Sequence, residues 1–586
     1  MQYNTEQQEV ILHKEGPALV LAGPGSGKTT VIAGRILALL THYHIPPNQI
    51  LVISFTRAAS REIEDRFREQ TATPAPVRFG TIHAIFYRIL KISCPETVFS
   101  VLPENLRQQW MRELLMELFE ADQAAVLSEE EQNRLQEAYR RRKEREGMLD
   151  FEDILEKSRD LFRRQPALLK HWQEQFRYIM IDEYQDTSPL QLELLKMLAG
   201  REQNLLAVGD DDQSIYGFRG ADSRLMLAFQ KDFPGASLYR LSDCYRCSPQ
   251  ILSSASSFIA HNTKRYRKEL KSLAMPGPRP VLHIFSEDGE EMRALLEELR
   301  RQARAGGSGE EAAILCRSRF GLRRVAAALA GAGLAFSCDE GPASDHRHWV
   351  AADVFAYLRL GRGSRSREDY LTVCNKPLRY LSRDLFREEK ISRQGLLSKL
   401  WEKPRMAAQL MQLFRQLDRL GGLMPFAAVE YIRREIGYDR YLKEYAAGRG
   451  ISPEPFYELL DRLQEESLLF ATAAEWEGAR EALLNRREKE DFRAEKKEKL
   501  ALMTMHGAKG LEFDRVYLPF LNEEEIPGGR GLKKEQTEEE RRLLYVAMTR
   551  ARRELWMSCG ARKKDGQGRP SRFLSEIDGL VLRGGN

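Results

Sequence analysis

The chain has 586 residues, which is too long for one hydrophobic core and predicts three or four domains. Hydrophobic residues make up 42% of the chain and charged residues 30%, as in a soluble globular protein. The 91 basic and 86 acidic side chains leave a net charge of +5, which is too small by itself to indicate a polyanionic partner. Seven scattered cysteines and a polar N-terminus exclude a disulfide-stapled secreted protein, and the absence of an apolar run of roughly 18 residues predicts no membrane span and a cytoplasmic location.

The first third of the chain alternates predicted strands with predicted helices. Short apolar runs, bounded by turn residues or ending in a polar residue, predict buried strands at 18–23, 49–55, 176–182 and 204–210. Apolar residues at helical spacing begin at Lys28. This pattern is typical of a parallel sheet whose chemistry lies at the carboxyl ends of its strands.

A second set of strands is predicted later in the chain, at 236–241, 312–318, 499–505, 514–520 and 553–559. Charge-rich helical sequence separates the strands of each set, and residues 524–540 resemble an exposed loop leading into a helix. The predicted fold class is therefore α/β, with two motor-like domains, each interrupted by a mainly helical insertion. The first domain is predicted at 1–88 and 149–240 with its insertion at 89–148, and the second at 241–376 and 496–586 with its insertion at 377–495.

A phosphate-binding loop is predicted between the first strand and the first long helix. The segment "GPGSGKT", Gly23 to Thr29, fits the pattern G-x-x-x-x-G-K-[ST] in the strand–helix context that this motif requires. Its glycines let backbone N–H groups surround phosphate oxygens at a helix N-terminus, with Lys28 near the β- and γ-phosphates and Thr29 on Mg²⁺. A plain glycine-rich turn is the alternative, and the flanking elements argue against it.

Acidic residues at the end of a later strand supply the partner of this loop. In "IMIDEYQD", Asp182 is placed beside the metal, and Glu183 is placed to orient or deprotonate the attacking water. Arg246 and Arg550 suit the charge that develops on the γ-phosphoryl oxygens, although an arginine in such a segment, taken alone, is more often a surface residue. Cys244 and Cys247 flank the first arginine, but no second pair at zinc-site spacing accompanies them.

The stretch "AVGDDDQSIYGFRGA", residues 207–221, combines an amide, two rings and a guanidinium in one short connection. Such a set suggests a surface that touches two different ligands. The residues concerned are Gln213, Tyr216, Phe218 and Arg219.

The ordered motifs of the chain resemble those of the UvrD/PcrA/Rep helicases of superfamily 1. The similar segments are, in chain order, "NTEQQEVI", "GPGSGKT", "SFTRAASREI", "GTIHA", "IDEYQDTS", the stretch from residue 207, "CYRCSPQIL", "MTMHGAKGLEFDRVYLP", "ERRLLYVAMTRARREL" and "PSRFLSEI". The resemblance covers nearly the whole chain, and the ordered set is more specific than any one motif. It implies that the two α/β domains are RecA-like P-loop motors with ATP between them.

By this resemblance, residue roles are expected at three kinds of site. The catalytic residues are expected to be Lys28, Glu183, Gln213, Arg246 and Arg550, and the metal ligands Thr29 and Asp182. Among them, Gln213 is expected to sense the γ-phosphate, and Arg246 and Arg550 to act as arginine fingers. ATP is expected to contact Gln7, Gly23, Pro24, Gly25, Ser26, Gly27, Lys28, Thr29, Thr30, Arg35, Tyr245, Arg246, Glu512 and Arg550, with Tyr245 and Arg35 on the adenine and Glu512 on the ribose. DNA is expected to contact Phe55, Thr56, Thr81, His83, Tyr216, Phe218, Arg219 and His506.

The implied function is an ATP- and Mg²⁺-dependent 3′–5′ DNA helicase, acting on single-stranded and partly duplex DNA in repair, replication restart or plasmid maintenance. A monomer or a DNA-induced dimer is expected, with repair or mobile-element proteins as possible loading partners. Three motifs depart from the family pattern: Phe218 replaces the usual Trp, Ala58 replaces a common Lys, and Cys244 and Cys247 flank "YR" where "NYRS" is usual.

Two further hypotheses stay open. Both insertions are shorter than in the best-known members. This feature motivates a single-strand translocase with weak unwinding that clears proteins or serves a phage-defence system. A non-catalytic DNA-binding module is opposed by the presence of Lys28, Thr29, Asp182 and Glu183.

Overall fold

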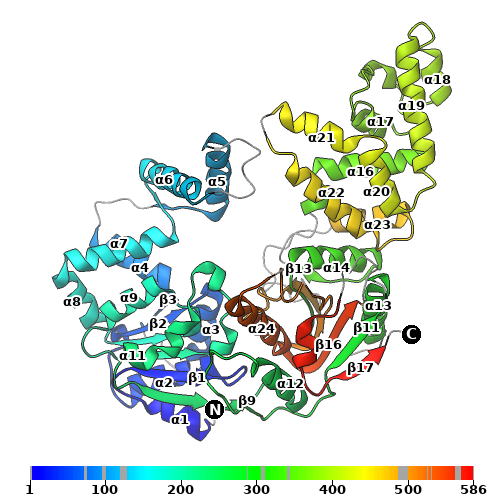
Figure 1. The fold of residues 1–586 in the computed structure, drawn as a ribbon. Helices are drawn as coiled ribbons and strands as arrows, with labels where there is room; N and C mark the ends of the chain where they lie inside the picture. The colour runs from blue at the N-terminus through cyan, green and yellow to red at the C-terminus, as the bar shows by residue number, and fades with distance from the viewer. Residues whose placement is uncertain are drawn as a thin grey trace. The chain divides into compact units, whose positions relative to one another are not determined.

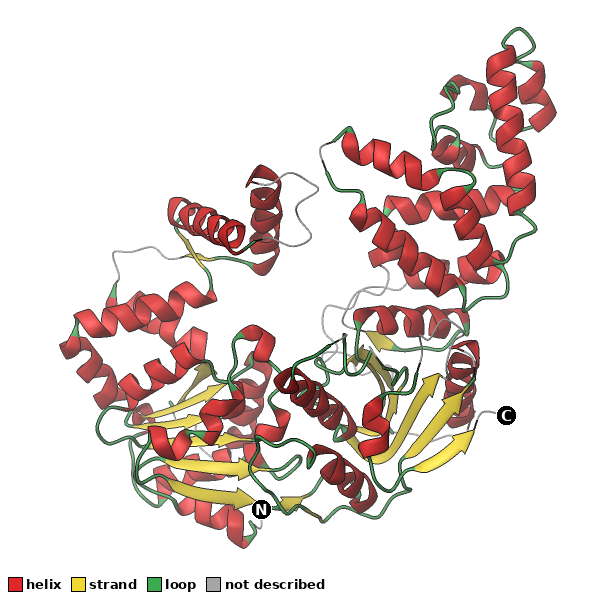
Figure 2. Ribbon diagram, in the orientation of Figure 1, coloured by secondary structure: helices red, strands yellow, loops and turns green. Residues whose placement is uncertain are grey.

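The computed structural model describes residues 3–71, 76–94, 100–118, 128–286, 288–304, 310–338, 344–449, 451–485, 499–523, 525–529, 531–560 and 569–584. The chain divides into two compact units, one made of 1–114, 132–284 and 505–586 and the other of 115–131 and 285–504. Figure 1 traces the chain and Figure 2 separates its helices from its strands. Among the helices of the described residues, none combines the length and apolarity that a bilayer crossing needs.

The first unit contains a six-stranded sheet in which every pairing is parallel. Its strands, in spatial order, are β3 (Arg78–Thr81), β2 (Ile50–Ser54), β6 (Tyr178–Ile181), β7 (Leu205–Gly209), β1 (Ala18–Ala22) and β8 (Ser237–Leu241). Five of these strands were predicted from apolar runs. The sixth, β3, has no fully buried residue, and its sequence RFGT therefore carries no apolar run to reveal it.

Two hydrophobic cores cover the two faces of this sheet. In β1, Leu19 and Leu21 belong to one core, while Val20 belongs to the other. Alternate residues thus point to opposite faces and both faces are buried, which explains why the strands have continuous apolar sequences. Helices α1 (Thr5–Leu12), α2 (Lys28–Thr41) and α3 (Arg57–Arg68) cover one face, and α4 (Ile82–Ser93), α7 (Phe151–Arg164), α8 (Pro166–Gln175) and α9 (Pro189–Ala199) the other.

The remaining elements of the first unit come from the middle and the last part of the chain. Residues 505–586 contribute β15 (Phe513–Leu518), α24 (Lys534–Met548), β16 (Ala551–Gly560) and β17 (Val581–Gly584), and β15 pairs with β16 in parallel. The shorter elements are η2 (Tyr184–Asp186), η3 (Asp211–Gln213), η4 (Gly217–Arg219), α10 (Ser223–Leu227), α11 (Phe229–Asp232), β9 (Asp243–Cys244), α12 (Pro249–Ile259), β10 (Lys271–Ser272) and η6 (Arg572–Glu576). Strand β11 (Val281–Phe285) pairs with β17 in parallel.

The sequence of the first predicted insertion folds mainly as helix. It contains α5 (Glu104–Leu118) and α6 (Glu129–Glu146), and two short strands, β4 (Ser100–Val101) and β5 (Met148–Leu149), pair in parallel. The bounds of the insertions and of the motor domains stay predictions.

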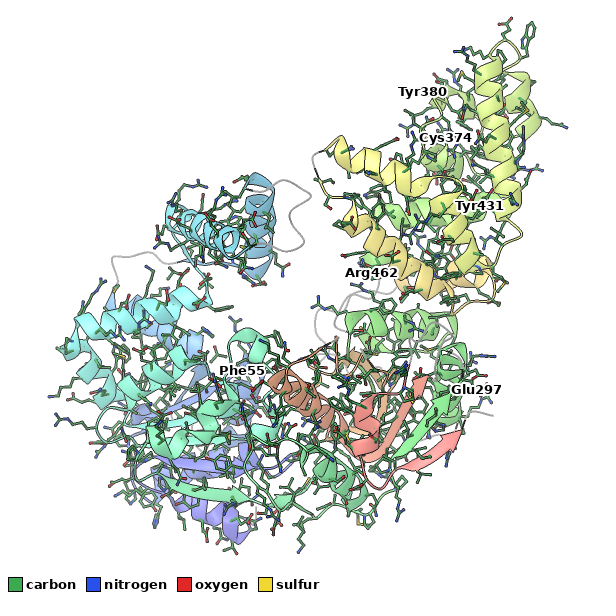
Figure 3. All side chains as sticks on the ribbon, viewed as in Figure 1. Phe55, Glu297, Cys374, Tyr380, Tyr431 and Arg462 are labelled. Atoms are coloured by element: carbon green, nitrogen blue, oxygen red, sulfur yellow. The ribbon has the colours of Figure 1, made fainter. Side chains whose placement is uncertain are left out.

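The second unit combines three parallel strands with a large helical part. Strand β14 (Leu500–Thr504) lies between β12 (Ala312–Cys316) and β13 (Ser337–Cys338). The helices are α13 (Asp288–Arg304), α14 (Arg319–Gly331), α15 (Ser344–Arg347), α16 (Trp349–Gly361), α17 (Arg367–Val373), α18 (Arg393–Ser398), α19 (Pro404–Leu420), α20 (Pro425–Arg434), α21 (Tyr438–Ala447), α22 (Glu454–Ser467) and α23 (Ala473–Asn485). One hydrophobic core from Val350 to Trp476 holds the helical part together, with Cys374 inside it and Tyr431 packed against it (Figure 3).

Candidate nucleotide and nucleic-acid site

Residues of the predicted motifs follow the strands of the six-stranded sheet. The phosphate loop begins directly after β1, Phe55 directly after β2, Asp182 directly after β6 and Asp210 directly after β7. Because the strands are parallel, their carboxyl ends meet at one edge of the sheet. The predicted chemistry therefore gathers at that edge.

The phosphate loop has the backbone conformation that its glycines permit. Gly25 and Gly27 have φ angles of 65° and 84°, and Gly27 is the N-cap of α2. A Cβ added at Gly25 would lie 2.4 Å from Cβ of Arg246, so this glycine also allows the Arg246 segment to approach. The Tyr245 N–H donates to the Gly25 carbonyl at 3.0 Å, and the buried Gln7 amide donates to the Ser26 carbonyl at 3.3 Å.

Lys28 and Glu183 form an ion pair at the mouth of this loop. Lys28 Nζ lies 3.7 Å from Glu183 Oε1, and both side chains are mostly buried. Burial opposes ionisation of Glu183, but the charges of Lys28 and Lys509 outweigh it and lower the pKa of Glu183 to about 2. The carboxylate is therefore ionised at neutral pH, as a group that accepts a proton from water must be.

Asp182 has the properties of a cation ligand. Its side chain is buried, and its Oδ1 has no hydrogen-bond partner among the described residues. Burial and the neighbouring Glu183 raise the pKa of Asp182 to about 7. A buried carboxylate with a free oxygen beside a phosphate-binding loop suits Mg²⁺, which prefers hard oxygen ligands. The residues present therefore fit a magnesium ion held by Asp182 and Thr29.

Gln213 connects this edge of the sheet to Arg550. Its amide nitrogen donates to Asp210 Oδ2 at 2.6 Å, and its Oε1 accepts from Arg550 Nη2 at 3.1 Å. Arg550 is 1% exposed and also donates to the carbonyls of Val546 and Leu511 at 2.9 and 3.1 Å. Burial, with the nearby charge of Arg246, lowers the pKa of Arg550 to about 10, so it stays protonated at neutral pH. Two residues 337 positions apart are thus brought into contact.

Arg246 and Glu512 contact each other directly. Arg246 Nε donates to Glu512 Oε2 at 2.5 Å, and Arg552 donates to the other carboxylate oxygen at 2.6 Å. Burial opposes ionisation of Glu512, but Arg246 and Arg552 outweigh it and lower the pKa of Glu512 to about 2. The predicted arginine finger and the predicted ribose ligand therefore share one ion pair, within reach of the phosphate loop.

The two residues predicted to flank the adenine differ in exposure. The Tyr245 ring is 47% exposed, and its hydroxyl accepts from Asn4 Nδ2 at 3.0 Å. Arg35 is 1% exposed on α2, and its Nη2 donates to the Lys14 carbonyl at 3.4 Å. Its Nε and Nη1 have no partner among the described residues. Thr30 accepts a hydrogen bond from Arg66 at 2.8 Å. The nucleotide roles of these residues stay predictions.

Four aromatic rings predicted to contact DNA form a continuous row. The rings of Phe55 and Tyr216 are stacked, with centroids 5.1 Å apart and planes at 14°. Phe218 lies edge-on to Tyr216 at 6.0 Å and to His506 at 5.5 Å. Phe218 is 67% exposed, so it can meet a base without rearrangement. Phe55 can be located in Figure 3, directly after β2.

The other predicted DNA contacts have local structural partners. Thr56 caps α3 by accepting from Ala59 N, and Thr81 caps α4 by accepting from Ala84 N. The His83 ring contacts Phe151 with centroids 4.9 Å apart. Arg219 ends η4, and its side chain lies outside the described residues. Their DNA roles stay predictions.

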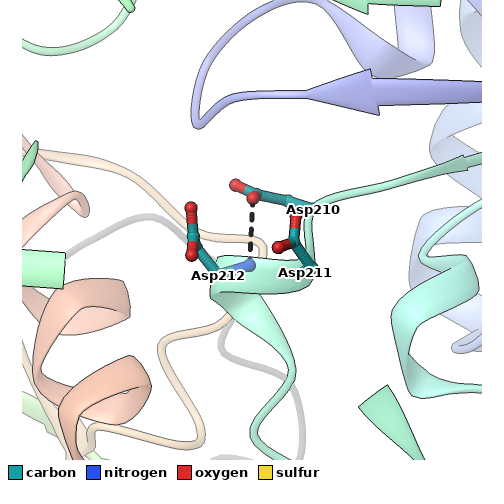
Figure 4. Close-up of side chains that lie close together, drawn as sticks. All are labelled: Asp210, Asp211 and Asp212. Atoms are coloured by element: carbon teal, nitrogen blue, oxygen red, sulfur yellow. Dashed lines mark hydrogen bonds between the residues drawn. The ribbon is translucent and has the colours of Figure 1, made fainter. Parts of the chain in front are cut away.

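Among the described residues, three consecutive aspartates lie close enough together to hold a metal ion: Asp210, Asp211 and Asp212 (Figure 4). The Lys268 ammonium lies 2.6 Å from Asp211 Oδ1 and 2.8 Å from Asp212 Oδ2, and it also contacts Asp210. Arg265 adds two bonds to Asp212, each 2.7 Å long. Because two cations already compensate these carboxylates, the cluster is a buried salt-bridge network. Sequence reasoning missed both cations, which lie in a charged stretch typical of a solvated loop.

Sequence reasoning also missed Lys509, although it lies in the quoted segment "MTMHGAKGLEF". Lys509 Nζ donates to Asp186 Oδ2 at 2.5 Å and to the Gln213 carbonyl at 2.8 Å. Arg542 Nε donates to the next carbonyl, that of Ser214, at 2.8 Å. The connection after β7 is therefore held by two cations from the last part of the chain.

Cys244 and Cys247 are buried free thiols. The hydrogen bond that Cys247 donates to Cys244, together with burial, raises the pKa of Cys247, and the same bond lowers the pKa of Cys244 to about 6. Among the described residues, no other His, Cys, Asp or Glu lies close enough to these two thiols to complete a metal site.

The fold and site together define a P-loop NTPase of the α/β class, in which distal arginines and a row of aromatic rings adjoin the nucleotide edge. Two family models match the chain: UvrD/REP helicase N-terminal domain over residues 3–125 and 96–234, and UvrD-like helicase C-terminal domain over residues 458–562. "Putative ATP-dependent DNA helicase YjcD" of Bacillus subtilis is 32% identical over 629 residues, covering 97% of this chain and 80% of that protein.

Two further relatives cover almost the whole chain. "DNA helicase II" of Haemophilus influenzae is 28% identical and "ATP-dependent DNA helicase PcrA" of Staphylococcus epidermidis is 29% identical; each alignment covers 98% of this chain and 86% of the relative. The chain belongs to the UvrD/Rep helicase family. The predicted family, the helicase class and the α/β fold with two RecA-like domains are thereby confirmed.

Proposed function

We propose that this chain is an ATP-dependent DNA helicase that moves 3′ to 5′ along single-stranded DNA and unwinds partly duplex DNA. The observation that carries the proposal is the contact of Gln213 Oε1 with Arg550 Nη2 at 3.1 Å. This contact joins Gln213, the predicted γ-phosphate sensor, to Arg550, a predicted arginine finger. Gln213 lies three residues before Tyr216, which belongs to the row of aromatic rings described above (the ring row: Phe55, Tyr216, Phe218 and His506). One short connection therefore reaches both the nucleotide side and the DNA side.

The residues at the sheet edge support ATP hydrolysis. Lys28 supplies positive charge at the phosphates, and the ionised Glu183 orients the attacking water and takes its proton. Arg550 and Arg246 stabilise the charge that develops on the γ-phosphoryl oxygens. Mg²⁺, held by Asp182 and Thr29, would neutralise phosphate charge when bound.

Movement follows from differential binding of ATP to two arrangements of the motor domains. ATP contacts favour the arrangement in which the distal arginines meet the phosphates, and loss of the γ-phosphate removes those contacts. The bases that stack on the ring row then change, so the strand is passed along the protein. Separating one duplex step costs about 1.4 kcal/mol of stacking, a load that ATP hydrolysis can meet.

The cellular setting belongs to the same proposal. DNA repair, replication restart or plasmid maintenance is the proposed role, in the cytoplasm, as a monomer or a DNA-induced dimer loaded by a repair or mobile-element protein. The names of the relatives support the DNA substrate.

A forked-duplex assay tests the function. We expect ATP-dependent unwinding of a fluorescent duplex with a 3′ single-stranded tail, and none of the same duplex with a 5′ tail. The ATPase rate should rise with added single-stranded DNA. Strong stimulation with an intact fork would favour the translocase hypothesis, and an ATPase rate indifferent to DNA would contradict both.

Replacing Tyr216 by alanine should weaken binding of single-stranded DNA by about tenfold, since stacking contributes roughly 1–3 kcal/mol per base. The Tyr216→Phe variant keeps the ring and is the matched control. Fluorescence anisotropy of a labelled oligothymidine measures both. Equal affinities of the alanine and phenylalanine variants would show that no base stacks on this ring.

A further inference from the structure

The Lys509 side chain, 8% exposed, occupies a position between three functional parts of the first unit. Its ammonium bonds Asp186 Oδ2 at 2.5 Å and the Gln213 carbonyl at 2.8 Å. The same ammonium lies 4.9 Å from the centroid of the Tyr216 ring. One cation thus touches the segment that carries Glu183, the backbone of the γ-phosphate sensor and a ring of the DNA row.

The contact of Lys509 with Asp186 on the nucleotide side is buried. The Asp186 side chain is fully buried, and its backbone N–H donates to the Glu183 carbonyl at 3.0 Å. A displacement of the Lys509 ammonium therefore breaks its bond to Asp186, three residues after Glu183, the residue proposed to activate water.

The contact on the DNA side is exchangeable. The Tyr216 ring carries both the Lys509 ammonium and the stacked Phe55 ring. A cation–π contact and a base stacked on an aromatic ring are attractions of comparable strength. A base arriving at Tyr216 can therefore compete with Lys509 for the ring.

We propose that Lys509 is the positioning residue that couples the nucleotide site to the Tyr216 ring, so that DNA binding and ATP turnover influence each other through its ammonium group. This inference rests on the proposed function. Coupling between two ligands is reciprocal, so the same residue transmits the state of the nucleotide to the affinity for a base.

Two other side chains, those of Arg542 and Glu539, also bond the backbone of the connection after β7, and neither residue was predicted to contact ATP. Arg542 Nε bonds the Ser214 carbonyl at 2.8 Å, and the Glu539 carboxylate accepts from Gly217 N at 3.0 Å. The connection therefore keeps two anchors when Lys509 is changed. A variant at Lys509 tests coupling more than it tests the integrity of the fold.

The test is the Lys509→Gln variant, whose amide keeps a hydrogen-bond donor but has neither charge nor cation–π contact. The measured quantity is the stimulation factor, the ATP turnover number at saturating oligothymidine divided by the turnover number without DNA. We expect this factor to fall about tenfold, within the usual range of coupling free energies. Lys509→Arg keeps the charge and should retain most of the stimulation.

A purely structural role would lower stimulated and basal turnover by the same proportion and leave the factor unchanged, and that result would overturn the inference. The double variant Lys509→Gln with Asp186→Asn leaves no buried unpaired charge and must show the same loss of stimulation if the single variant does not fold. The control is Lys264→Gln, which removes an exposed lysine 3.1 Å from Glu535 and should keep the wild-type factor.

A second readout follows the ring itself. Oligonucleotides that contain 2-aminopurine report stacking by fluorescence quenching, and a nonhydrolysable ATP analogue should change this quenching in the wild-type complex. We expect the change to be lost in Lys509→Gln, and its persistence would overturn the inference. If the wild-type protein itself shows no DNA stimulation, it is the proposed function that fails.

Discussion

Replacing Lys28 by alanine should lower ATP turnover at saturating single-stranded DNA by about 10²–10³-fold, the usual cost of removing one charge-stabilising group from a transition state. Two effects combine in this variant. The positive charge at the phosphates is lost, and Glu183 loses the ion pair that its Oε1 makes with Lys28 Nζ at 3.7 Å. Since Lys28 is the largest influence that lowers the pKa of Glu183, its removal raises that pKa.

The measurements are steady-state ATPase kinetics and oligothymidine binding by fluorescence anisotropy. Binding of DNA without nucleotide should persist, because the ring row from Phe55 to His506 does not include Lys28. Lys14→Ala is the control, since Lys14 is an exposed lysine 3.4 Å from Glu15. A Lys28→Ala enzyme that kept turnover within about tenfold of wild type would contradict the predicted role, because one decade is only about 1.4 kcal/mol of activation free energy.

The parts of the fold that the sequence predicts are those buried on both sides. Strands β1, β2, β6 and β7 are fully buried along their length, and each therefore has an apolar run that ends in the site. Strands β3 and β17 escaped prediction for the opposite reason: β3 has no fully buried residue, and all four residues of β17 are exposed. Edge strands need no continuous apolar sequence because solvent covers part of them.

The phosphate loop was predictable because phosphate binding constrains residue types at a fixed local spacing. The contacts of Lys509 and Arg542 were not, since they join positions 323 and 328 residues apart in the chain. In sequence, both cations resemble the surface lysines and arginines that are abundant elsewhere. Only the fold shows that they are buried against the connection after β7.

The same limit applies to the pairing of predicted residues. The resemblance assigned Arg246 to the phosphates and Glu512 to the ribose, and it gave no reason for them to bond each other at 2.5 Å. This ion pair holds the Arg246 guanidinium in place. The two arginines also differ in their partners: Arg246 bonds Glu512 through Nε, and Arg550 bonds the predicted sensor Gln213 through Nη2.

Arg550→Lys should therefore reduce the ATP turnover number by about 10³-fold, the lower end of what an arginine finger contributes, with a much smaller change in KM for ATP. Lysine keeps the positive charge but cannot reproduce the planar fork of donors. In Arg550 that fork reaches the Gln213 amide oxygen at 3.1 Å and the backbone carbonyls of Val546 and Leu511 at 2.9 and 3.1 Å. The Gln213 side chain would lose this hydrogen bond and keep the one that its amide nitrogen donates to Asp210 at 2.6 Å.

Arg541→Lys is the matched control, because Arg541 is also buried but bonds Glu576 and Asn262 at 2.7 Å instead of any predicted site residue. Both variants should lower the thermal unfolding midpoint, since each leaves buried acceptors without a donor. Only Arg550→Lys should lower the turnover number beyond what the loss of folded protein explains. Equal losses of turnover in the two variants would mean that Arg550 acts by supporting the fold, because a group that stabilises only the transition state must affect the turnover number specifically.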